Sequence, residues 1–231
     1  WSSEYIKEKL IKIDLNKEPL PDFGSIDCAC LLASKQPHSE DIWNDYYKIN
    51  SKQILKFIDK KINQLIYISS SSVNLLDSIP NPKNHYGLSK FVGEKLLKIN
   101  KIYFKQSTVL RFPSVIGINH KNGIIHDLRS WIEEKRQIDL FDNGNKIRNI
   151  LHVNDAVKSI LLAIRSFSSL NEYEEFNIGS QDSITLAEIT SSLIDLMSVE
   201  TTVNLLDNSS KSEDVYIDNS EAISKIGYAP I

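Results

Sequence analysis

Residues 65–72 read Leu-Ile-Tyr-Ile-Ser-Ser-Ser-Ser, and residues 86–90 read Tyr-Gly-Leu-Ser-Lys. The first stretch is typical of a short buried strand that ends in hydroxyl side chains. In the second, Tyr86 and Lys90 are four positions apart, so a helix projects both from one face. An ammonium beside a phenol favours the phenolate and lowers its pKa, which gives a proton-transfer group usable near neutral pH. A strand-end serine such as Ser70 would complete a polar cluster for a substrate alcohol or ketone.

Short apolar runs alternate with helical patterns on both sides of this stretch. Strands are predicted over residues 9–15, 26–32, 65–68 and 107–110, and helices over residues 45–62 and 86–100. This alternation is typical of a doubly wound parallel sheet, in which ligands bind outside the carboxyl ends of the strands. The serine run, the helix with Tyr86 and Lys90, and Arg111 are expected near that edge. The apolar stripe of this helix (Leu88, Phe91 or Val92, Leu96, Ile99) is offset from the Tyr86–Lys90 face, which leaves that face for a cleft.

The second half of the chain is more mixed. The patterns predict a helix over 124–134, a hairpin over 138–151 around Asp142-Asn-Gly144, a helix through 157–164 capped by Asn154 or Asp155, a strand over 175–178, a helix to Met197 with a Thr185-x-x-Glu188 capping box, and a short helix over 220–225. We therefore expect a Rossmann-like, N-terminally incomplete α/β domain over 1–115 plus 152–180. A small mixed α/β substrate-binding lobe is expected over 116–151 plus 181–231.

Composition excludes several classes of protein. The net charge of −3 gives no electrostatic footprint for nucleic acid, and no apolar run approaches the roughly 20 residues of a membrane helix. The histidines form no metal-ligand pattern, so no metal is expected. Cys28 and Cys30 lie two apart in a strand-like run, where they would point to one face as buried thiols. A reducing cytoplasm is the expected location.

With these pieces in order, the sequence resembles the extended short-chain dehydrogenase/reductase family, in particular its NAD-dependent nucleotide-sugar epimerases and dehydratases. Ser70, Tyr86 and Lys90 match the catalytic Ser/Thr and the Tyr-x-x-x-Lys pair of that family. The other matching segments are Asp14-Leu15, Leu32-Ala33-Ser34, Asn50, Arg111-Phe-Pro113-Ser114-Val-Ile-Gly117, Arg148 to Asp155, Asn177-Ile-Gly179 and Ile226 to Pro230.

The resemblance implies roles for these residues. NAD, with NADP as an alternative, is expected to contact Asp14, Leu15, Leu32, Ala33, Ser34, Asn50, Ser69, Tyr86, Lys90 and Pro113. The nucleotide-sugar substrate is expected to contact Ser71, Ser114 and Arg148, whose guanidinium would hold the diphosphate. A homodimer through the helices over 45–62 and 86–100 is expected in the same way. From the residues themselves, Arg111 is expected to be structural and buried against a carboxylate, and His152 to be a packing residue or one that supports the ligand-contacting residues.

The sequence departs from the family in two places. The Gly-rich pyrophosphate loop, which lets backbone N–H groups approach the phosphates, is absent from residues 1–231 and would precede Trp1. The simpler explanation is a missing upstream segment, and a natural cofactor-free relative is the alternative. Ser70-Ser71-Ser72 also replaces the Thr-Asp-Glu of the 4,6-dehydratases, and three hydroxyls cannot replace a carboxylic acid and its conjugate base.

These observations predict an NAD-dependent nucleotide-sugar epimerase, acting at C4 of a UDP-hexose by transient oxidation with Tyr86 as the base. An NADP-dependent nucleotide-sugar reductase or dehydrogenase is the first alternative. The second is a non-catalytic relative that serves as a binding or scaffold protein.

Overall fold

The structure is a computed structural model. It describes residues 11–15, 17–37, 42–73, 75–76, 79–80, 82–118, 120–208 and 213–230. The chain divides into two compact units. The first comprises Trp1–Tyr67 and Ser72–Ser107, and the second comprises Ile68–Ser71 and Thr108–Ile231.

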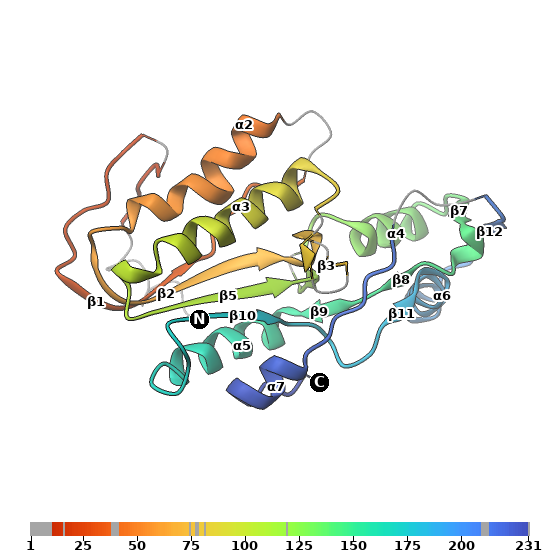
Figure 1. Cartoon of the computed structure of the whole chain (residues 1–231). Helices are drawn as coiled ribbons and strands as arrows, with labels where there is room; N and C mark the ends of the chain where they lie inside the picture. Colours follow the sequence, from red (N-terminus) through yellow and green to blue (C-terminus); the bar gives the residue numbers. More distant parts are fainter. Residues whose placement is uncertain are drawn as a thin grey trace. The chain divides into compact units, whose positions relative to one another are not determined.

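The first unit is built on two parallel strands. Strand β1 (Ser25–Leu31) pairs with β2 (Lys61–Ser70) from Ser25 opposite Lys61 to Leu31 opposite Tyr67. Helix α2 (Trp43–Tyr46), the π-helical turn η1 (Tyr47–Ser51) and the 3-10 turn η2 (Lys52–Lys56) connect them. Helix α3 (His85–Ile99) follows β2, and Figure 1 shows α2 and α3 on the same side of β1 and β2. The parallel pair with helical connections confirms the predicted α/β class.

Two predictions for this unit are wrong. No strand forms over residues 11–15, where the chain turns as the Asp14 carbonyl accepts hydrogen bonds from the backbone N–H groups of Lys17 and Glu18. Residues 9–10 of that predicted strand lie outside the described residues. The helix predicted over 45–62 ends at Lys56, because the chain reverses at Asp59, which has a φ of 65°, and enters β2. Ile62 therefore contributes to the sheet rather than to a helical stripe.

The central sheet has the order β1-β2-β5-β10, and both β2 and β5 contribute residues to each unit. Strand β5 (Gln106–Phe112) is buried along its whole length, as expected for an inner strand. Strand β10 (Tyr173–Asn177) lies at the end of the order, and α5 (Val153–Arg165) and α7 (Ser220–Ile226) lie beside it in Figure 1.

The remainder of the second unit is a mixture of short strands and helices. Strand β6 (Ser114–Ile116) pairs in parallel with β9 (Ile150–His152), and β7 (Ile138–Phe141) pairs in parallel with β12 (Val203–Leu206). Strand β8 (Ile147–Arg148) is antiparallel to β11 (Ile184–Thr185). The other elements are η3 (Ser71–Val73), β3 (Leu75–Leu76), β4 (Ile79–Pro80), η4 (Lys101–Tyr103), α4 (Ile124–Glu133), η5 (Asp142–Gly144) and α6 (Leu186–Met197).

The hairpin predicted over 138–151 is wrong, because β7 and β8 pair with different strands. Asp142, Asn143 and Gly144 all have positive φ angles and form a turn, as the sequence suggested. A Cβ at Gly144 would lie 2.8 Å from the Cβ of Ala187, so the glycine lets the turn approach α6. The turn therefore redirects the chain toward α6 instead of folding it back on itself.

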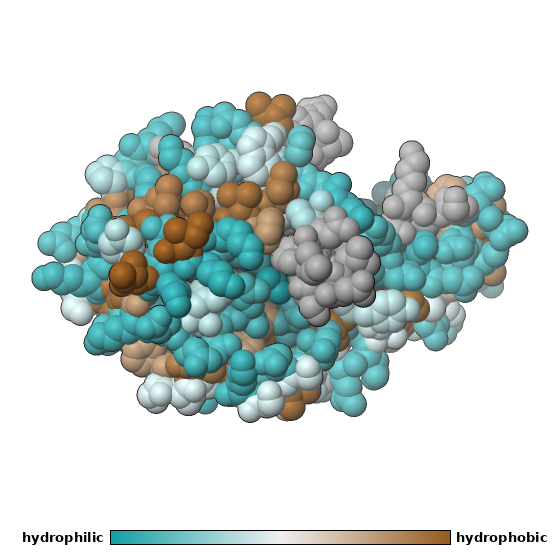
Figure 2. Space-filling model, in the orientation of Figure 1, coloured by the Kyte–Doolittle hydropathy of each residue, from teal (hydrophilic) through white to brown (hydrophobic). Residues whose placement is uncertain are grey.

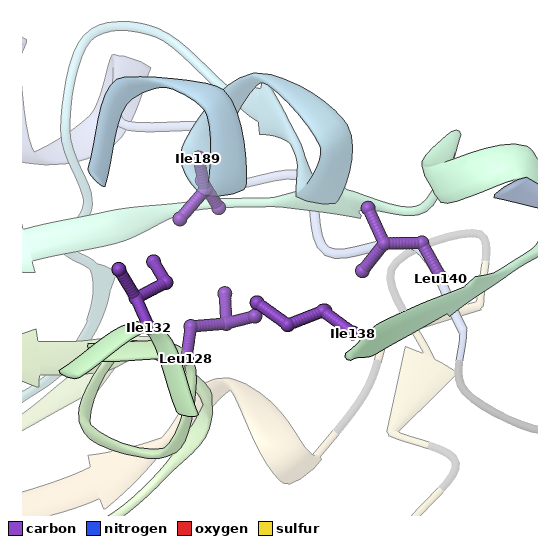
Figure 3. Close-up of a cluster of buried hydrophobic side chains, with 5 residues drawn as sticks. All are labelled: Leu128, Ile132, Ile138, Leu140 and Ile189. Carbon is purple, nitrogen blue, oxygen red and sulfur yellow. The ribbon is translucent and has the colours of Figure 1, made fainter. Parts of the chain in front are cut away.

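A separate apolar core stabilises the predicted substrate-binding lobe. Figure 3 shows Leu128 and Ile132 of α4, Ile138 and Leu140 of β7, and Ile189 of α6 directed toward one another. All five side chains are buried, and all lie within residues 116–151 and 181–231. The domain boundaries predicted from the sequence remain a prediction, although this cluster supports a distinct lobe.

Helix ends follow the sequence in one case and depart from it in another. Helix α6 begins with the predicted capping box, in which Thr185 and Glu188 exchange hydrogen bonds. The predicted caps of α5, Asn154 and Asp155, are wrong, because His152 is the N-cap and its Nδ1 accepts from the Asn154 N–H at 3.3 Å. His152 is therefore an exposed cap instead of a packing residue.

Cys28 and Cys30 are free thiols, and both are half-buried instead of fully buried. Among the described residues, no helix is both long and apolar enough to cross a membrane. Within those same ranges, no group of three His, Cys, Asp or Glu side chains is placed to hold a metal ion.

Candidate functional site

Tyr86 and Lys90 lie on the buried face of α3. Tyr86 is 9% exposed and Lys90 is 2% exposed, so neither side chain faces bulk solvent. The helix begins where the Asn84 side chain accepts a hydrogen bond from the Gly87 N–H at 2.8 Å. The Lys90 ammonium lies 5.9 Å from the centroid of the Tyr86 ring. The structure thus places the predicted phenol and amine together in a buried environment.

Burial also changes the protonation of Lys90. It lowers the pKa of this ammonium from its ordinary 10.5 to about 8, and the negative charge of Glu94 opposes the shift. Lys90 therefore carries its charge at neutral pH and loses it within a unit or two above. A cation near a phenol favours the phenolate form of the phenol.

Asn50 organises the backbone around this helix. Its side-chain oxygen accepts from the Lys35 N–H at 2.7 Å and from the Ser34 hydroxyl at 3.2 Å. Its amide donates to the Ser89 hydroxyl at 2.9 Å, and that hydroxyl donates to the Tyr86 carbonyl at 2.7 Å. One buried amide thus connects the segment after β1 with the first turn of α3.

Two glycines allow α3 to lie this close to its neighbours. A Cβ at Gly87 would overlap the Ser72 carbonyl, and a Cβ at Gly93 would overlap the Tyr67 hydroxyl. The Tyr67 hydroxyl donates to the Asn50 carbonyl at 2.6 Å. Helix α3 is therefore seated directly on the Ser72 backbone and the Tyr67 side chain, both of which precede it in the sequence.

The two faces of α3 differ from the prediction. The sequence suggested that the apolar stripe is offset from the Tyr86–Lys90 face, which would leave that face for a cleft. Instead the polar face is buried, whereas Leu88 and Ile99 of the apolar stripe are exposed, Ile99 by 76%. The polar face can be buried because its hydroxyl and charged groups interact with other protein groups and because its glycines allow close packing.

Ser69, Ser70 and Ser71 belong to the second unit. Ser69 and Ser70 are the last two residues of β2 and are buried, and Ser71 begins η3. Pro113 is buried directly after β5, and the exposed Ser114 begins β6. Figure 1 shows the arrowheads of β2 and β5 at the same edge of the sheet. These residues thus follow the carboxyl ends of neighbouring strands, where α/β proteins bind ligands.

The residues before and after β1 that are predicted to contact the dinucleotide are more exposed than Ser69, Ser70 and Pro113. Asp14 and Leu15 lie at the turn that precedes β1. Leu32 and Ala33 directly follow β1 and are exposed, Leu32 by 62%, although Leu31 before them is buried.

The two arginines lie in different environments of the second unit. Arg111 is buried, and its guanidinium forms an ion pair with Glu175, which also accepts from the Tyr173 hydroxyl at 2.8 Å. The predicted structural role of Arg111 is therefore confirmed. Arg148 is half-buried, and its Nη1 donates to the Glu213 carbonyl at 3.0 Å. Burial lowers the pKa of Arg148, and the charge of Asp214 opposes this shift.

The late segments of the sequence converge on one loop. The Asn219 side chain accepts from the Gly179 N–H at 2.8 Å, and the Tyr228 hydroxyl donates to the Gly179 carbonyl at 2.9 Å. Asn149 accepts from the Ser180 N–H at 2.9 Å. A Cβ at Gly179 would lie 2.6 Å from the Asn149 side-chain oxygen, so only glycine fits. These motif residues fix the loop that follows β10.

Sequence reasoning missed three residues of the α3 site: Tyr67, Ser89 and Glu94. Ser89 lies inside the Tyr-x-x-Ser-Lys stretch, and Glu94 lies one helical turn after Lys90. That spacing could have suggested Glu94 as a partner of Lys90. Tyr67 gave no comparable signal, because an aromatic residue in an apolar strand is ordinarily a core residue.

Comparison with known proteins places this arrangement in a family. A model of the NAD dependent epimerase/dehydratase family matches residues 20–179. An uncharacterised UDP-glucose epimerase of Bacillus subtilis is 24% identical over 244 residues, which cover 98% of this chain and 75% of that protein. A putative UDP-glucose 4-epimerase of Methanocaldococcus jannaschii is 29% identical over 109 residues, which cover 45% of this chain and only 35% of that protein.

The fold agrees with this relationship. The crystal structure of UDP-glucuronic acid 4-epimerase from Bacillus cereus in complex with NAD superposes with a TM-score of 0.79 at 23% identity, covering 95% of this chain and 72% of that one. The matched family region, residues 20–179, contains the serine run, Tyr86, Lys90 and Gly179. The chain belongs to the NAD dependent epimerase/dehydratase family.

Proposed function

We propose that this protein is an NAD-dependent nucleotide-sugar epimerase that inverts C4 of a UDP-linked hexose. The observation that carries the proposal is the buried pair of Tyr86 and Lys90 on α3, at the position of the Tyr-x-x-x-Lys motif. Relatives named as UDP-glucose epimerases, and the similar fold of an NAD-bound UDP-glucuronic acid 4-epimerase, support it.

The residues after β1 fit a dinucleotide. Leu32 and Ala33 expose apolar groups at the carboxyl end of a parallel strand, and Asn50 holds the Ser34 hydroxyl and the Lys35 backbone beside them. An exposed apolar strand end of this kind suits a flat ring or ribose. Asp14, Leu15, Ser69, Pro113, Tyr86 and Lys90 complete the proposed NAD site. The role of Asn50 is indirect, because its amide is engaged by protein groups.

The proton steps belong to the chain itself. Bound nicotinamide would supply hydride acceptance and return. Tyr86 removes the proton from the sugar hydroxyl and later restores it, and Lys90 stabilises the phenolate. Ser70 donates a hydrogen bond to the same sugar oxygen. Three hydroxyls at residues 70–72 leave no acid–base pair for elimination of water, so dehydration is disfavoured.

Substrate contacts are proposed from the second unit. Ser71 and Ser114 hold the sugar, and Arg148 binds the diphosphate with a bidentate guanidinium. The carbonyls of Ile147 and Glu213 orient this guanidinium, at 2.7 and 3.0 Å.

A homodimer through α2 and α3 is part of the proposal. Leu88 and Ile99 on α3, and Ile42 beside α2, expose apolar surface. Figure 2 shows apolar side chains gathered over this part of the first unit. A second copy would cover such a patch. A cytoplasmic location, where nucleotide sugars and NAD are available, remains a prediction.

A panel of nucleotide sugars tests this function. The intact protein is incubated with NAD and UDP-glucose, UDP-galactose or UDP-glucuronic acid, and the products are separated by chromatography. We expect the C4 epimer of at least one of them, with no net formation of NADH. Stoichiometric formation of NADH, or consumption of NADPH, would instead indicate the dehydrogenase or reductase. Absence of turnover by a folded, NAD-binding protein would contradict the proposal.

A further inference from the structure

The buried face of α3 carries two opposite charges one helical turn apart. Lys90 is 2% exposed and Glu94 is 0% exposed, and residues four apart lie on the same face of a helix. A buried ammonium without a counter-charge is strongly unfavourable and loses its proton instead. The protonation state of Lys90 therefore depends on the charged and aromatic side chains near its ammonium.

Two tyrosine rings lie near the Lys90 ammonium, and the charge of Glu94, one helical turn away, acts on it. The Tyr67 ring of β2 has its centroid 5.3 Å from Nζ, and the Tyr86 ring of α3 has its centroid 5.9 Å away. Tyr46 of α2 packs edge-on against Tyr86, with ring centroids 6.3 Å apart. Aromatic faces attract a cation but cannot balance a full buried charge. Among these groups, Glu94 is the one that has a carboxylate side chain.

The two tyrosines beside Lys90 are not equivalent. The Tyr67 hydroxyl donates to the Asn50 carbonyl at 2.6 Å, in a space that Gly93 leaves open. Burial, the charge of Glu94 and the proximity of Tyr86 all raise the pKa of Tyr67. Tyr67 is thus held as a neutral donor, and its ring forms a fixed wall for the ammonium. Proton transfer is left to Tyr86.

We propose that Glu94 is a positioning residue that keeps Lys90 protonated at neutral pH, so that the ammonium remains available to the Tyr86 phenolate. The proposal rests on the function proposed above for Tyr86 and Lys90, and it adds the residue that maintains their charge state. Glu94 acts through Lys90 and touches neither substrate nor cofactor in this account.

The pKa of Lys90 in the ligand-free protein tests this role. Competitive acylation of lysines across a range of pH, followed by mass spectrometry of the peptide that contains Lys90, reports its pKa directly. The wild type is expected near pH 8. In Glu94→Gln the pKa is expected to fall by about one pH unit, because the favourable charge is gone. An unchanged or higher pKa would overturn the proposal.

Two further variants control this experiment. Glu133→Gln removes an exposed carboxylate on α4 and should leave the pKa of Lys90 unchanged. Glu94→Asp keeps the charge on a shorter side chain and should lower the pKa by a smaller step. If Glu94→Gln does not fold, this second variant decides the question: a Lys90 pKa at or slightly below that of the wild type supports the role, because the charge is retained, and a Lys90 pKa above that of the wild type contradicts it.

The readout needs neither substrate nor cofactor. A lowered pKa of Lys90 together with an absence of sugar-nucleotide turnover would therefore support the role of Glu94 in setting the charge and would reject the epimerase function. Turnover by the wild type together with an unchanged Lys90 pKa in Glu94→Gln would support the epimerase function and would reject the role of Glu94. If both proposals hold, the alkaline limb of kcat/KM in Glu94→Gln should move to lower pH with the Lys90 pKa.

Discussion

The buried Lys90 side chain is expected to determine how the α3 site responds to pH. Water no longer solvates its ammonium, so the charged form is penalised in the folded protein, and its pKa falls to about 8. Burial of the charged ammonium therefore lowers the free energy of unfolding near neutral pH, where the protein is expected to work. Functional sites commonly hold such perturbed groups, because the same burial that destabilises a charge also strengthens its effect on a neighbour.

Stability should therefore rise with pH over a defined window. Between about pH 8 and 10.5 the unfolded chain retains a proton on Lys90 that the folded chain has lost. The free energy of unfolding then increases with pH, by at most about 1.4 kcal/mol per pH unit from this group. Denaturant unfolding of the wild type and of Lys90→Met measures the contribution as a difference. We expect the wild type to gain on the variant across the window, and a constant difference would contradict the buried charge.

Individual residues of the site differ in how well the sequence reveals them. Tyr86 and Lys90 were predictable, because one spacing carries both the helix geometry and the chemistry. Glu94 and Tyr67 were not recognised, since their roles depend on burial and on a strand that is distant in the sequence. The hydrogen bond from the Tyr67 hydroxyl to the Asn50 carbonyl depends on the tertiary structure and has no signature in the sequence.

At the scale of elements, α3 shows why an apolar stripe does not always mark the buried face. Its polar side is buried because Ser89, Lys90 and Glu94 find partners within the first unit. Its apolar side then remains for another surface, and the exposed Ile99 is a prominent part of it. An amphipathic pattern predicts two different faces, and the neighbouring elements decide which face is covered.

The apolar face of α3 leads to a prediction about assembly. Ile99→Glu places a charge on the proposed dimer surface and should convert the dimer into a monomer, because burial of an unpaired carboxylate is unfavourable. Leu196→Glu, at a site on α6 that is 81% exposed, is the matched control and should not alter the assembly. Light scattering of the purified proteins measures the mass. A wild-type monomer, or a dimer that survives Ile99→Glu, would contradict this interface.

The elements that sequence patterns missed share a physical cause. Strands β7 and β8 are short and pair with β12 and β11, so their partners lie far along the chain. Local periodicity reports burial, but it carries no information about which distant strand supplies the hydrogen bonds. The cap of α5 was misplaced by two or three residues for a related reason, since His152 is an uncommon cap.

For the whole molecule, the α/β class was predictable because strands and helices alternate along the chain. The division into units was harder to predict. Strands β2 and β5 contribute to both units, so no linker or change of composition marks a boundary. The late motifs illustrate a further limit, because their sequence identified the family but only the structure showed that they secure the loop at Gly179.

Replacement of Tyr86 by phenylalanine tests the central claim most directly. Interconversion of UDP-glucose and UDP-galactose is measured for the wild type, Tyr86→Phe and the exposed control Tyr103→Phe, with folding checked by circular dichroism. Loss of a general base should lower kcat by about 100-fold to 10,000-fold in Tyr86→Phe, while Tyr103→Phe should retain wild-type turnover. A folded Tyr86→Phe variant that turns over sugar nucleotide at the wild-type rate would contradict the account.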